Sequence, residues 1–374
     1  MQVKIDGIIY QNQSYGGVSR IFTEILPRMC NFDPALQITI FTSGSCQQNI
    51  PTHPSIKHQS LFPVDDLLRP RRIWYPIQQP ARKLVQKLAI DNTTRAVWHS
   101  TYFTKPRNWN GPMVVTVYDM IHERFPDFFA SRNIDRFRKQ KRSCVLAADS
   151  VICISETTLK DVQSYYGVDS AKLHAIPLAY NRVFRVLEPD DCSKIQSGTK
   201  PFILYIGERS RYKNFKMLLQ AYGLWQQRNE VDLLVVGRGW SDQERKWLFD
   251  CGCDEQVRLL EHIDDQALNC LYNQAQAFIY PSLFEGFGIP LLEAMASGCP
   301  IVASRIPSTL EVAGKQPFYF ETKNIDSLLS ALDLALMQGR KPSRVETGIK
   351  LAKRYSWNET AQKTLLVYRS LLDD

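Results

Sequence analysis

Two glutamates with seven residues between them, including a glycine-containing loop, have the most chemically specific spacing in the chain. Glu285 and Glu293 follow an apolar run typical of a buried strand. Gly286 and Gly288 predict a tight loop with exposed backbone amides, and Pro290 suits the first position of a helix. Because a helix start presents free N–H groups and the positive end of the helix dipole, this place is expected to bind phosphate.

Glu293 also has a simpler explanation. We expect it in the first turn of the helix, where an acidic side chain stabilises the helix by ~0.3–1 kcal/mol. That explanation does not say why a glycine loop separates it from Glu285, so both interpretations stay open.

The elements that must position these residues alternate along the chain. Short β-branched or aromatic runs alternate with longer segments of helical periodicity. The predicted strands are 4–10, 36–41, 113–118, 151–155 and 174–178, then 202–206, 232–236, 257–260, 277–280, 300–303 and 318–320; the predicted helices include 18–30, 133–148 and 156–166. The pattern predicts an α/β fold with two doubly wound, Rossmann-like domains facing across a cleft, and ligands beyond the carboxyl ends of the strands.

The domain boundaries follow from changes in composition. We expect an N-terminal domain over 1–188, a polar linker over 189–200 and a C-terminal domain over 201–355. A final helix over 356–374 begins with a capping-box pattern, and we expect it to pack back on the N-terminal domain.

Composition sets broad limits on the class of protein. The chain has 374 residues, 44% hydrophobic and 22% charged, with a net charge of +8, which is typical of a globular protein with two domains. No apolar run or amino-terminal pattern predicts a membrane span or a signal peptide. Nine cysteines without a CxxC pair predict reduced thiols. These features predict a cytoplasmic protein.

The segment around Glu285 and Glu293 resembles the E-x7-E signature of retaining nucleotide-sugar glycosyltransferases of family 4, which have the GT-B fold. Gly207, Arg209 and Lys213 match the family's residues after the first strand of the second domain. Other matches are Gly16-Gly17, Val236–Gly239, Leu260–His262 and Tyr355–Trp357, so the resemblance spans nearly the whole chain.

The resemblance implies roles for these positions. Glu293 would accept hydrogen bonds from the ribose, and Glu285 with the amides of Phe287 and Gly288 would hold the donor sugar. The residues expected to bind the donor are Gly16, Gly17, Gly207, Glu285, Gly286, Phe287, Gly288, Ile289, Leu292 and Glu293.

The charges at Arg209 and Lys213 fit the same chemistry. A nucleoside diphosphate leaving group gains concentrated negative charge as the glycosidic bond breaks, and a cation must neutralise it. Arginine offers a fork to phosphate oxygens and lysine a point charge. Arg211 is a competing assignment, and an exposed basic turn is the structural alternative.

The chain departs from the family at one position. Many members have His-Asp after the strand that corresponds to 113–117, whereas this chain has Tyr118-Asp119. Tyr118 could still donate a hydrogen bond, and His122 or His99 could supply an imidazole. A lone histidine is more often a structural residue whose hydrogen bonds are satisfied within the fold, so both interpretations stay open.

The resemblance implies retention through a same-face reaction, in which the departing phosphate helps to deprotonate the acceptor hydroxyl. Glu285 then has no covalent role of the kind found in glycosidases. We expect no cofactor and no metal, because Asp65-Asp66 and Asp264-Asp265 lack supporting ligands and are solvated or helix-starting residues.

Two basic clusters lie in the first domain, interleaved with aromatic residues. They comprise Arg69, Arg71, Arg72, Arg82, Lys83 and Lys87, and Arg132, Arg136, Arg138, Lys139, Lys141 and Arg142. They predict peripheral contact with the anionic inner membrane surface, with a solvated helix face as the alternative. No nucleic-acid motif accompanies the charge.

The prediction is therefore a retaining, metal-independent hexosyltransferase. It would use a UDP- or GDP-sugar and a glycan, lipid-linked or small-molecule acceptor in polysaccharide or glycolipid biosynthesis. The alternatives are a nucleotide-sugar epimerase of the same fold, a transferase for a small aglycone, and a non-catalytic nucleotide-sugar-binding protein.

Overall fold

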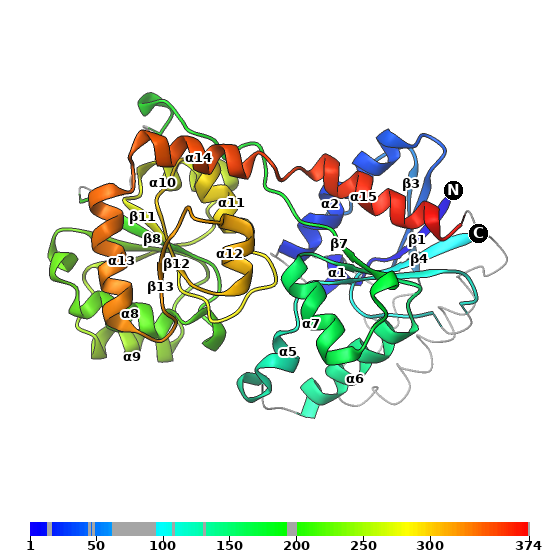
Figure 1. The fold of residues 1–374 in the computed structure, drawn as a ribbon, viewed down its shortest axis with the longest axis horizontal. Coiled ribbons are helices and arrows are strands. Elements are labelled where there is room, and N and C mark those ends of the chain that lie inside the picture. Colours follow the sequence, from blue (N-terminus) through cyan, green and yellow to red (C-terminus); the bar gives the residue numbers. More distant parts are fainter. Residues whose placement is uncertain are drawn as a thin grey trace. The chain divides into compact units, whose positions relative to one another are not determined.

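The computed structural model describes residues 1–12, 17–43, 46, 49–61, 95–106, 109–129, 132–192 and 200–372. The chain forms two units, and the first joins the two ends of the sequence (Figure 1). Unit 1 comprises Met1–Leu178 with Trp357–Asp374, and unit 2 comprises Ala179–Ser356. Gly16, Asp65-Asp66, the basic cluster at 69–87 and residues 193–199 of the expected linker lie outside the described residues.

Unit 1 is built on a seven-stranded parallel sheet in the order β3-β2-β1-β4-β5-β6-β7. Its strands are β1 (Gln2–Asp6), β2 (Gln37–Ser43), β3 (Ile56–Leu61), β4 (Ala96–Ser100), β5 (Met113–Val117), β6 (Ser150–Cys153) and β7 (Leu173–Ala175). Its helices are α1 (Ile8–Asn12), α2 (Gly17–Phe32), α5 (Ile121–Arg124), α6 (Arg132–Ala147), α7 (Glu156–Tyr166) and α15 (Trp357–Ser370), with 3-10 turns η1 (Pro126–Phe129) and η2 (Ser170–Lys172).

Unit 2 is built on a six-stranded parallel sheet in the order β10-β9-β8-β11-β12-β13. Its strands are β8 (Phe202–Ile206), β9 (Asp232–Val236), β10 (Val257–Leu260), β11 (Ala277–Tyr280), β12 (Ile301–Ser304) and β13 (Phe318–Phe320). Its helices are α8 (Phe215–Leu224), α9 (Asp242–Asp250), α10 (Asp265–Gln274), α11 (Ile289–Ala296), α12 (Pro307–Ala313), α13 (Ile325–Gln338) and α14 (Pro342–Ala352), with 3-10 turns η3 (Pro189–Cys192), η4 (Arg211–Lys213) and η5 (Gln226–Asn229).

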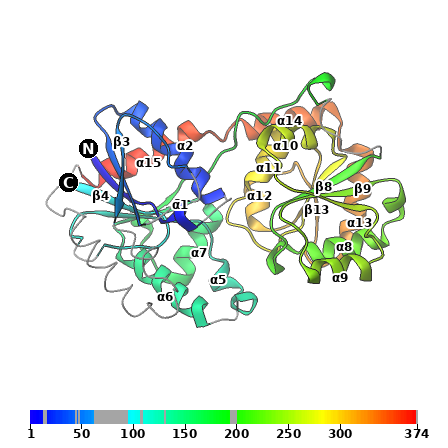
Figure 2. The same cartoon turned by 180° about the vertical axis from the view of Figure 1, so that it is seen from behind.

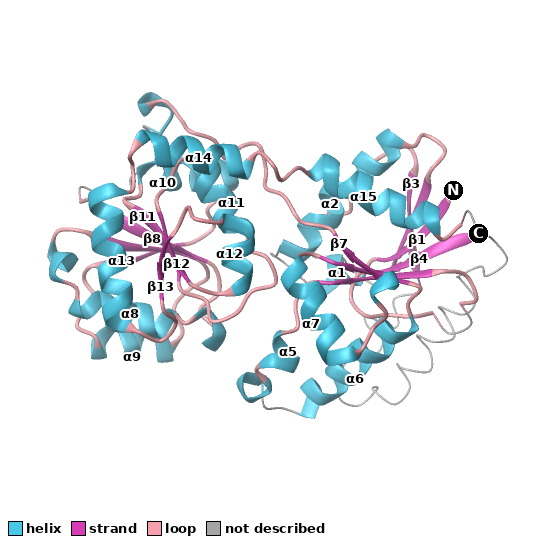
Figure 3. Cartoon of the chain, in the orientation of Figure 1, coloured by secondary structure: helices cyan, strands magenta, loops and turns pink. Residues whose placement is uncertain are grey.

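Figure 3 shows helices around the strands of each sheet, as the alternating sequence pattern predicts. Every strand pair in both sheets is parallel. Each central strand is buried on both faces, which explains its continuous apolar sequence. The predicted class, two doubly wound parallel α/β sheets, is confirmed.

The first predicted strand, 4–10, is too long. It ends before Gly7, and Ile8–Tyr10 is instead the start of α1. The Gly7 N–H donates to the Phe41 carbonyl at 2.6 Å, and a Cβ at this position would lie 2.5 Å from Thr42 Cγ2. The chain turns here because glycine lets the backbone approach β2 closely.

Two strands escaped the sequence prediction. β3 is an edge strand whose central residues 57–60 are polar and largely solvent-accessible. β4 is buried throughout, yet it ends in His99 and Ser100, so it does not read as an apolar run. Polar residues in both strands interrupt the apolar run by which the other strands were predicted.

The C-terminal helix α15 belongs to unit 1 and packs against α2 (Figure 2). Thr360 Oγ1 donates to the Pro177 carbonyl at 2.8 Å, and Arg369 pairs with Asp33 at 3.0 Å. The buried Tyr368 hydroxyl is hydrogen-bonded to His99 Nδ1.

A buried ion pair ties α6 to α5 inside unit 1. Lys141 Nζ lies 2.8 Å from Glu123 Oε2 and donates to the Asp119 carbonyl at 2.8 Å, while the Tyr166 hydroxyl donates to Glu123 at 2.6 Å. The Lys141 side chain is only 1% exposed. Its assignment to a basic surface that contacts a membrane is therefore wrong, because the helical face that carries Lys141 points into the core.

Substituting Lys141→Ala should lower the free energy of unfolding by about 3–5 kcal/mol, because the Glu123 carboxylate would remain buried without its cation. Urea denaturation would measure the loss. Lys139→Ala, on the exposed face of the same helix, should stay within about 0.5 kcal/mol of the parent. A loss below about 1 kcal/mol in Lys141→Ala would show that the pair does not stabilise unit 1.

Candidate active site

The loop after β11 carries Glu285 and leads into α11. Gly288 caps this helix with φ +115°, a conformation that favours glycine, and Ile289 is the first helical residue. Pro290 is therefore second rather than first. Glu293 is the fifth residue of α11 and lies beyond the first turn, so the prediction that placed it there is wrong. Since the dipole effect fades beyond the first turn, helix stabilisation does not explain Glu293.

The structure brings Glu285 and Lys213 into direct contact. Lys213 Nζ donates to Glu285 Oε1 at 2.6 Å, and the two side chains remain 21% and 12% exposed. Lys213 ends η4, after β8, and Glu285 follows β11, the neighbouring strand. Burial acts to lower the pKa of Lys213, but Glu285, with Tyr212 and Glu208, outweighs it and holds that pKa above its ordinary value. The ammonium group therefore stays charged at neutral pH.

Two tyrosine rings lie beside this ion pair, and a third tyrosine, Tyr205, interacts electrostatically with Glu285 while its hydroxyl donates to the Glu208 carbonyl. Lys213 Nζ lies 5.2 Å from the centre of the Tyr212 ring and 6.0 Å from that of Tyr280. Burial raises the pKa of Tyr280 and Tyr205 well above the ordinary value, and the Glu285 charge adds to both effects. Their hydroxyls therefore remain protonated hydrogen-bond donors. Sequence reasoning missed Tyr280, although a polar aromatic residue at the carboxyl end of a strand was the available signal.

Glu293 is buried between α11 and α10. The Tyr272 hydroxyl of α10 donates to Glu293 Oε2 at 3.3 Å. Burial raises the pKa of Tyr272 well above its ordinary value, and the Glu293 carboxylate raises it further. Tyr272, a second residue that sequence reasoning missed, therefore orients this carboxylate.

Arg209 and Lys213 were expected to point into the site together, but they contact different carboxylates. Its Nε and Nη2 atoms donate to the two carboxylate oxygens of Glu244 at 2.7 and 3.3 Å. Its Nη2 also donates to the Arg238 and Gly239 carbonyls. The fork predicted for phosphate is therefore occupied by a carboxylate of this chain. The competing residue, Arg211, is exposed in η4.

The other residues of unit 2 that are predicted to bind the donor differ in where their side chains lie. Leu292 is fully buried, and the Phe287 ring packs edge-on against Tyr355 in the core. The Leu292 side chain therefore fills the core, and Phe287 can offer only its backbone to a donor. Gly286 is buried in the loop, Ile289 is half-buried at the start of α11, and Gly207 turns the chain after β8 with φ +119°.

His99 is a core residue of unit 1. It is 0% exposed, with Nδ1 at the Tyr368 hydroxyl and Nε2 2.8 Å from Thr116 Oγ1. Burial lowers the pKa of His99 to about 3, so the ring is neutral. Packing and both ring hydrogen bonds account for this residue, which agrees with its interpretation as a satisfied structural histidine.

Tyr118 and His122 follow β5 in unit 1. The buried Tyr118 hydroxyl donates to the Thr101 carbonyl at 2.6 Å, and burial raises its pKa. The His122 ring lies 4.4 Å from Phe129 and 5.0 Å from Phe137, and burial lowers its pKa. Its buried Nδ1 finds no hydrogen-bond partner among the residues that the structure describes.

The other predicted residues have simpler placements. Gly17 is the first residue of α2, and its neighbour Gly16 is outside the described residues. Asp264 caps α10 by accepting a hydrogen bond from the Ala267 amide at 2.8 Å, which agrees with the helix-starting interpretation.

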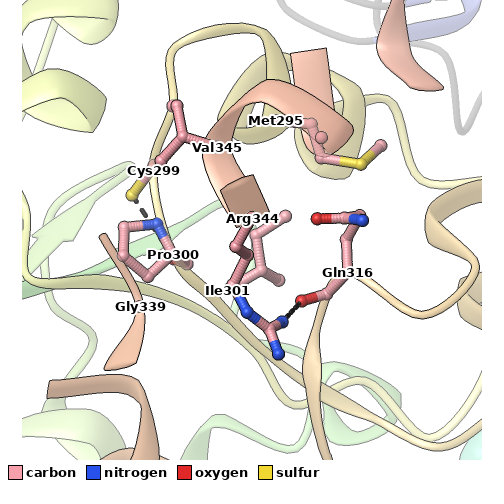
Figure 4. A pocket seen from close by; sticks show the side chains of 10 residues that line it. Met295, Cys299, Pro300, Ile301, Gln316, Gly339, Arg344 and Val345 are labelled. Atoms are coloured by element: carbon pink, nitrogen blue, oxygen red, sulfur yellow. Dashed lines mark hydrogen bonds between the residues drawn. The ribbon is translucent and has the colours of Figure 1, made fainter. Parts of the chain in front are cut away.

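A small cavity lies between α11, β12 and α14 in unit 2 (Figure 4). Arg344 borders it and donates to the Gln316 carbonyl, as the dashed line in Figure 4 shows. Its volume of about 20 Å³ has room for a single water molecule and not for a nucleotide or a sugar. The cavity is therefore too small to serve as the donor site expected at Glu285.

The chain has the GT-B fold of several solved glycosyltransferases. It resembles sucrose-phosphate synthase from Thermosynechococcus elongatus, with a TM-score of 0.80 and 18% identity over 100% of this chain and 99% of that one. It also resembles Anabaena Alr3699/HepE, solved in complex with UDP-glucose, with a TM-score of 0.73 and 15% identity over 99% of both chains. Two doubly wound α/β units are common to this class.

The sequence identifies the family. Residues 190–352 match the family "Glycosyl transferases group 1", and residues 15–182 match "Glycosyltransferase Family 4". The chain is 28% identical over 307 residues to O-antigen chain mannosyltransferase B of Escherichia coli, covering 79% of each sequence. The chain belongs to the group 1 glycosyltransferases, as the E-x7-E resemblance predicts.

Substituting Gly288→Ala should lower the free energy of unfolding by about 1–3 kcal/mol because of the positive φ, and should weaken UDP and GDP binding. A Cβ there would lie 3.0 Å from Leu291 Cδ1, so the tip of the Leu291 side chain must move slightly. Denaturation and calorimetric titration would measure both effects. Gly252→Ala is the control, since Gly252 has φ +57° and no atom within 4 Å of a Cβ. Equal nucleotide affinities in the two variants would show that the loop at Gly288 does not contribute to nucleotide binding.

Proposed function

We propose that this chain is a retaining hexosyltransferase that moves a hexose from a UDP- or GDP-sugar to an acceptor hydroxyl in polysaccharide or glycolipid biosynthesis. The observation that carries the proposal is the partly exposed Lys213–Glu285 pair at the carboxyl ends of two adjacent strands. An ammonium and a carboxylate in contact can be separated by a ligand that carries both an anion and hydroxyl groups. A nucleoside diphosphate sugar is such a ligand.

In this proposal Lys213 serves the leaving group. The bond between the anomeric carbon and the phosphate oxygen breaks, and its electron pair leaves with the nucleoside diphosphate. The Lys213 ammonium group stabilises the charge that develops on that phosphate. The acceptor oxygen bonds to the anomeric carbon on the same face, and its proton passes to the departing phosphate. Because the Lys213 ammonium group supplies the positive charge, it supports the proposal that the reaction needs no metal ion.

Glu285 and Glu293 then bind the two ends of the donor. With Lys213 on the phosphate, the Glu285 carboxylate is available to the hydroxyls of the sugar, and the tyrosine hydroxyls nearby remain donors. Glu293, fixed by Tyr272 at 3.3 Å, accepts the ribose hydroxyls. The family resemblance supports both assignments.

The relatives favour particular partners. O-antigen chain mannosyltransferase B supports mannose as the hexose and a glycan or lipid-linked glycan as the acceptor. The HepE complex with UDP-glucose keeps UDP-sugars among the candidate donors, and small-molecule acceptors remain within the class. Within the described ranges, no helix is long and apolar enough to cross a membrane. The exposed basic residues of α6 support peripheral contact with an anionic membrane at the cytoplasmic face.

Substituting Lys213→Ala should lower turnover by at least ~10²-fold, because the leaving-group charge would lose its cation. Steady-state transfer assays with GDP-mannose and UDP-glucose would measure it, and NMR of the product would test retention at the anomeric carbon. Lys216→Ala is the control, since Lys216 lies one turn away in α8 with Nζ 5.7 Å from the Trp247 ring centre. A folded Lys213→Ala protein with the parent rate would contradict this role.

Substituting Glu293→Ala should mainly weaken binding of the nucleotide, roughly tenfold, because the ribose would lose a charged acceptor. Calorimetry with UDP and GDP measures this directly. Glu346→Ala, an exposed residue of α14, should bind both nucleotides as the parent does. Unchanged UDP and GDP affinities in Glu293→Ala would refute the ribose assignment.

A further inference from the structure

Arg209 is almost fully buried in unit 2, and its hydrogen bonds are unevenly distributed. The side chain is 1% exposed. Nε and Nη2 share two contacts with Glu244 and two with backbone carbonyls, at 2.7 to 3.3 Å. Nη1 is also buried, yet it has no hydrogen-bond partner within the described part of the chain. A buried charged donor without an acceptor is unfavourable, so this atom is poised for an acceptor from a ligand.

Glu244 is itself rigidly held at the start of α9. It is the third residue of this helix and closes a capping box with Ser241. Its Oε2 accepts from the Ser241 amide at 2.7 Å and from the Ser241 hydroxyl at 2.8 Å. Burial acts to raise the pKa of Glu244, but the hydrogen bonds from Arg209 and Ser241 outweigh it and lower that pKa. The carboxylate is therefore charged and fixed.

The absence of a side chain at Gly237 keeps space beside Arg209 Nη1. A Cβ at Gly237 would lie 2.8 Å from Nη1 and 3.0 Å from the Gly207 carbonyl. Gly207 follows β8 and Gly237 follows β9, so both lie at the carboxyl edge of the sheet, where ligands bind in this fold class. On its other side the guanidinium is covered by the Trp240 ring, whose centre is 4.6 Å from Arg209 Cζ.

We propose that Glu244 is a positioning residue for the donor. It occupies the Nε–Nη2 edge of Arg209, so that the guanidinium presents Nη1 alone, beside Gly207 and Gly237, to a phosphate oxygen of a nucleoside diphosphate. A single fixed N–H group contacts one oxygen and leaves the rest of the diphosphate to Lys213. The inference rests on the proposed function and adds a residue that the E-x7-E pattern does not contain.

The test is Glu244→Gln, which keeps the side-chain shape and removes the charge that holds Arg209. We expect binding of GDP and UDP to weaken roughly 10- to 100-fold, because a charge-assisted hydrogen bond is lost from its fixed position. Guanosine and uridine, which carry no phosphate, should bind as they do to the parent. Calorimetric titration of all four compounds measures the contrast, and a purely structural role would not produce it.

Asp264→Ala is the matched control, because it removes the cap of α10, the next helix along the chain, without touching Arg209. It should lower the thermal midpoint and leave all four affinities unchanged. If Glu244→Gln does not fold, Gly237→Ala tests the same space, since its Cβ would crowd Nη1; it should show the same selective loss.

The outcomes separate the two proposals. Equal losses for diphosphates and nucleosides, or no loss in a folded Glu244→Gln protein, would overturn the role of Glu244 while the parent still binds donors. A parent protein that binds neither GDP nor UDP would overturn the proposed function and this inference together.

Discussion

The ion pair between Lys213 and Glu285 is the interaction on which the site depends. It joins the loops after β8 and β11, which are neighbouring strands of a parallel sheet, so both loops start at the same edge. A backbone hydrogen bond of 2.7 Å from the Leu283 amide to the Tyr212 carbonyl fixes the same two loops beside the charged groups. The parallel order of the sheet therefore places opposite charges in contact from positions 72 residues apart.

Three of the lysine or arginine pairs with glutamate among the described residues differ in exposure, and the difference indicates their roles. The side chains of Lys141–Glu123 are 1% and 4% exposed, and those of Arg209–Glu244 are 1% and 5% exposed. Removing either partner of such a pair would leave an uncompensated buried charge, so both pairs act mainly as fixed parts of the core. Lys213–Glu285, at 21% and 12%, is accessible to a ligand that can replace each partner. Only this third pair is suited to exchange its contacts during a reaction.

The fold could be predicted largely from apolar periodicity, because strands buried on both faces of a parallel sheet form continuous apolar runs. The prediction failed where polar residues are buried or where glycine allows a turn, as at His99 in β4 and at Gly7 after β1. In the site, the glycine loop and the two glutamates were visible from spacing alone. Tyr272 and Glu244 were not, because their partners lie 21 and 35 residues away in sequence and only the packing of the unit brings them together. Arg209 shows the limit most clearly, since residue type predicted a phosphate contact and the structure gives its Nε and Nη2 atoms to Glu244 and two backbone carbonyls.

The most direct test of the account is a crystal structure of this protein with an intact nucleoside diphosphate sugar, read at Lys213 and Glu285. The account predicts that the pair separates, with Lys213 Nζ about 2.8 Å from a phosphate oxygen and the Glu285 carboxylate hydrogen-bonded to the sugar. A donor bound in unit 2 with the 2.6 Å contact between Lys213 and Glu285 still intact would contradict it.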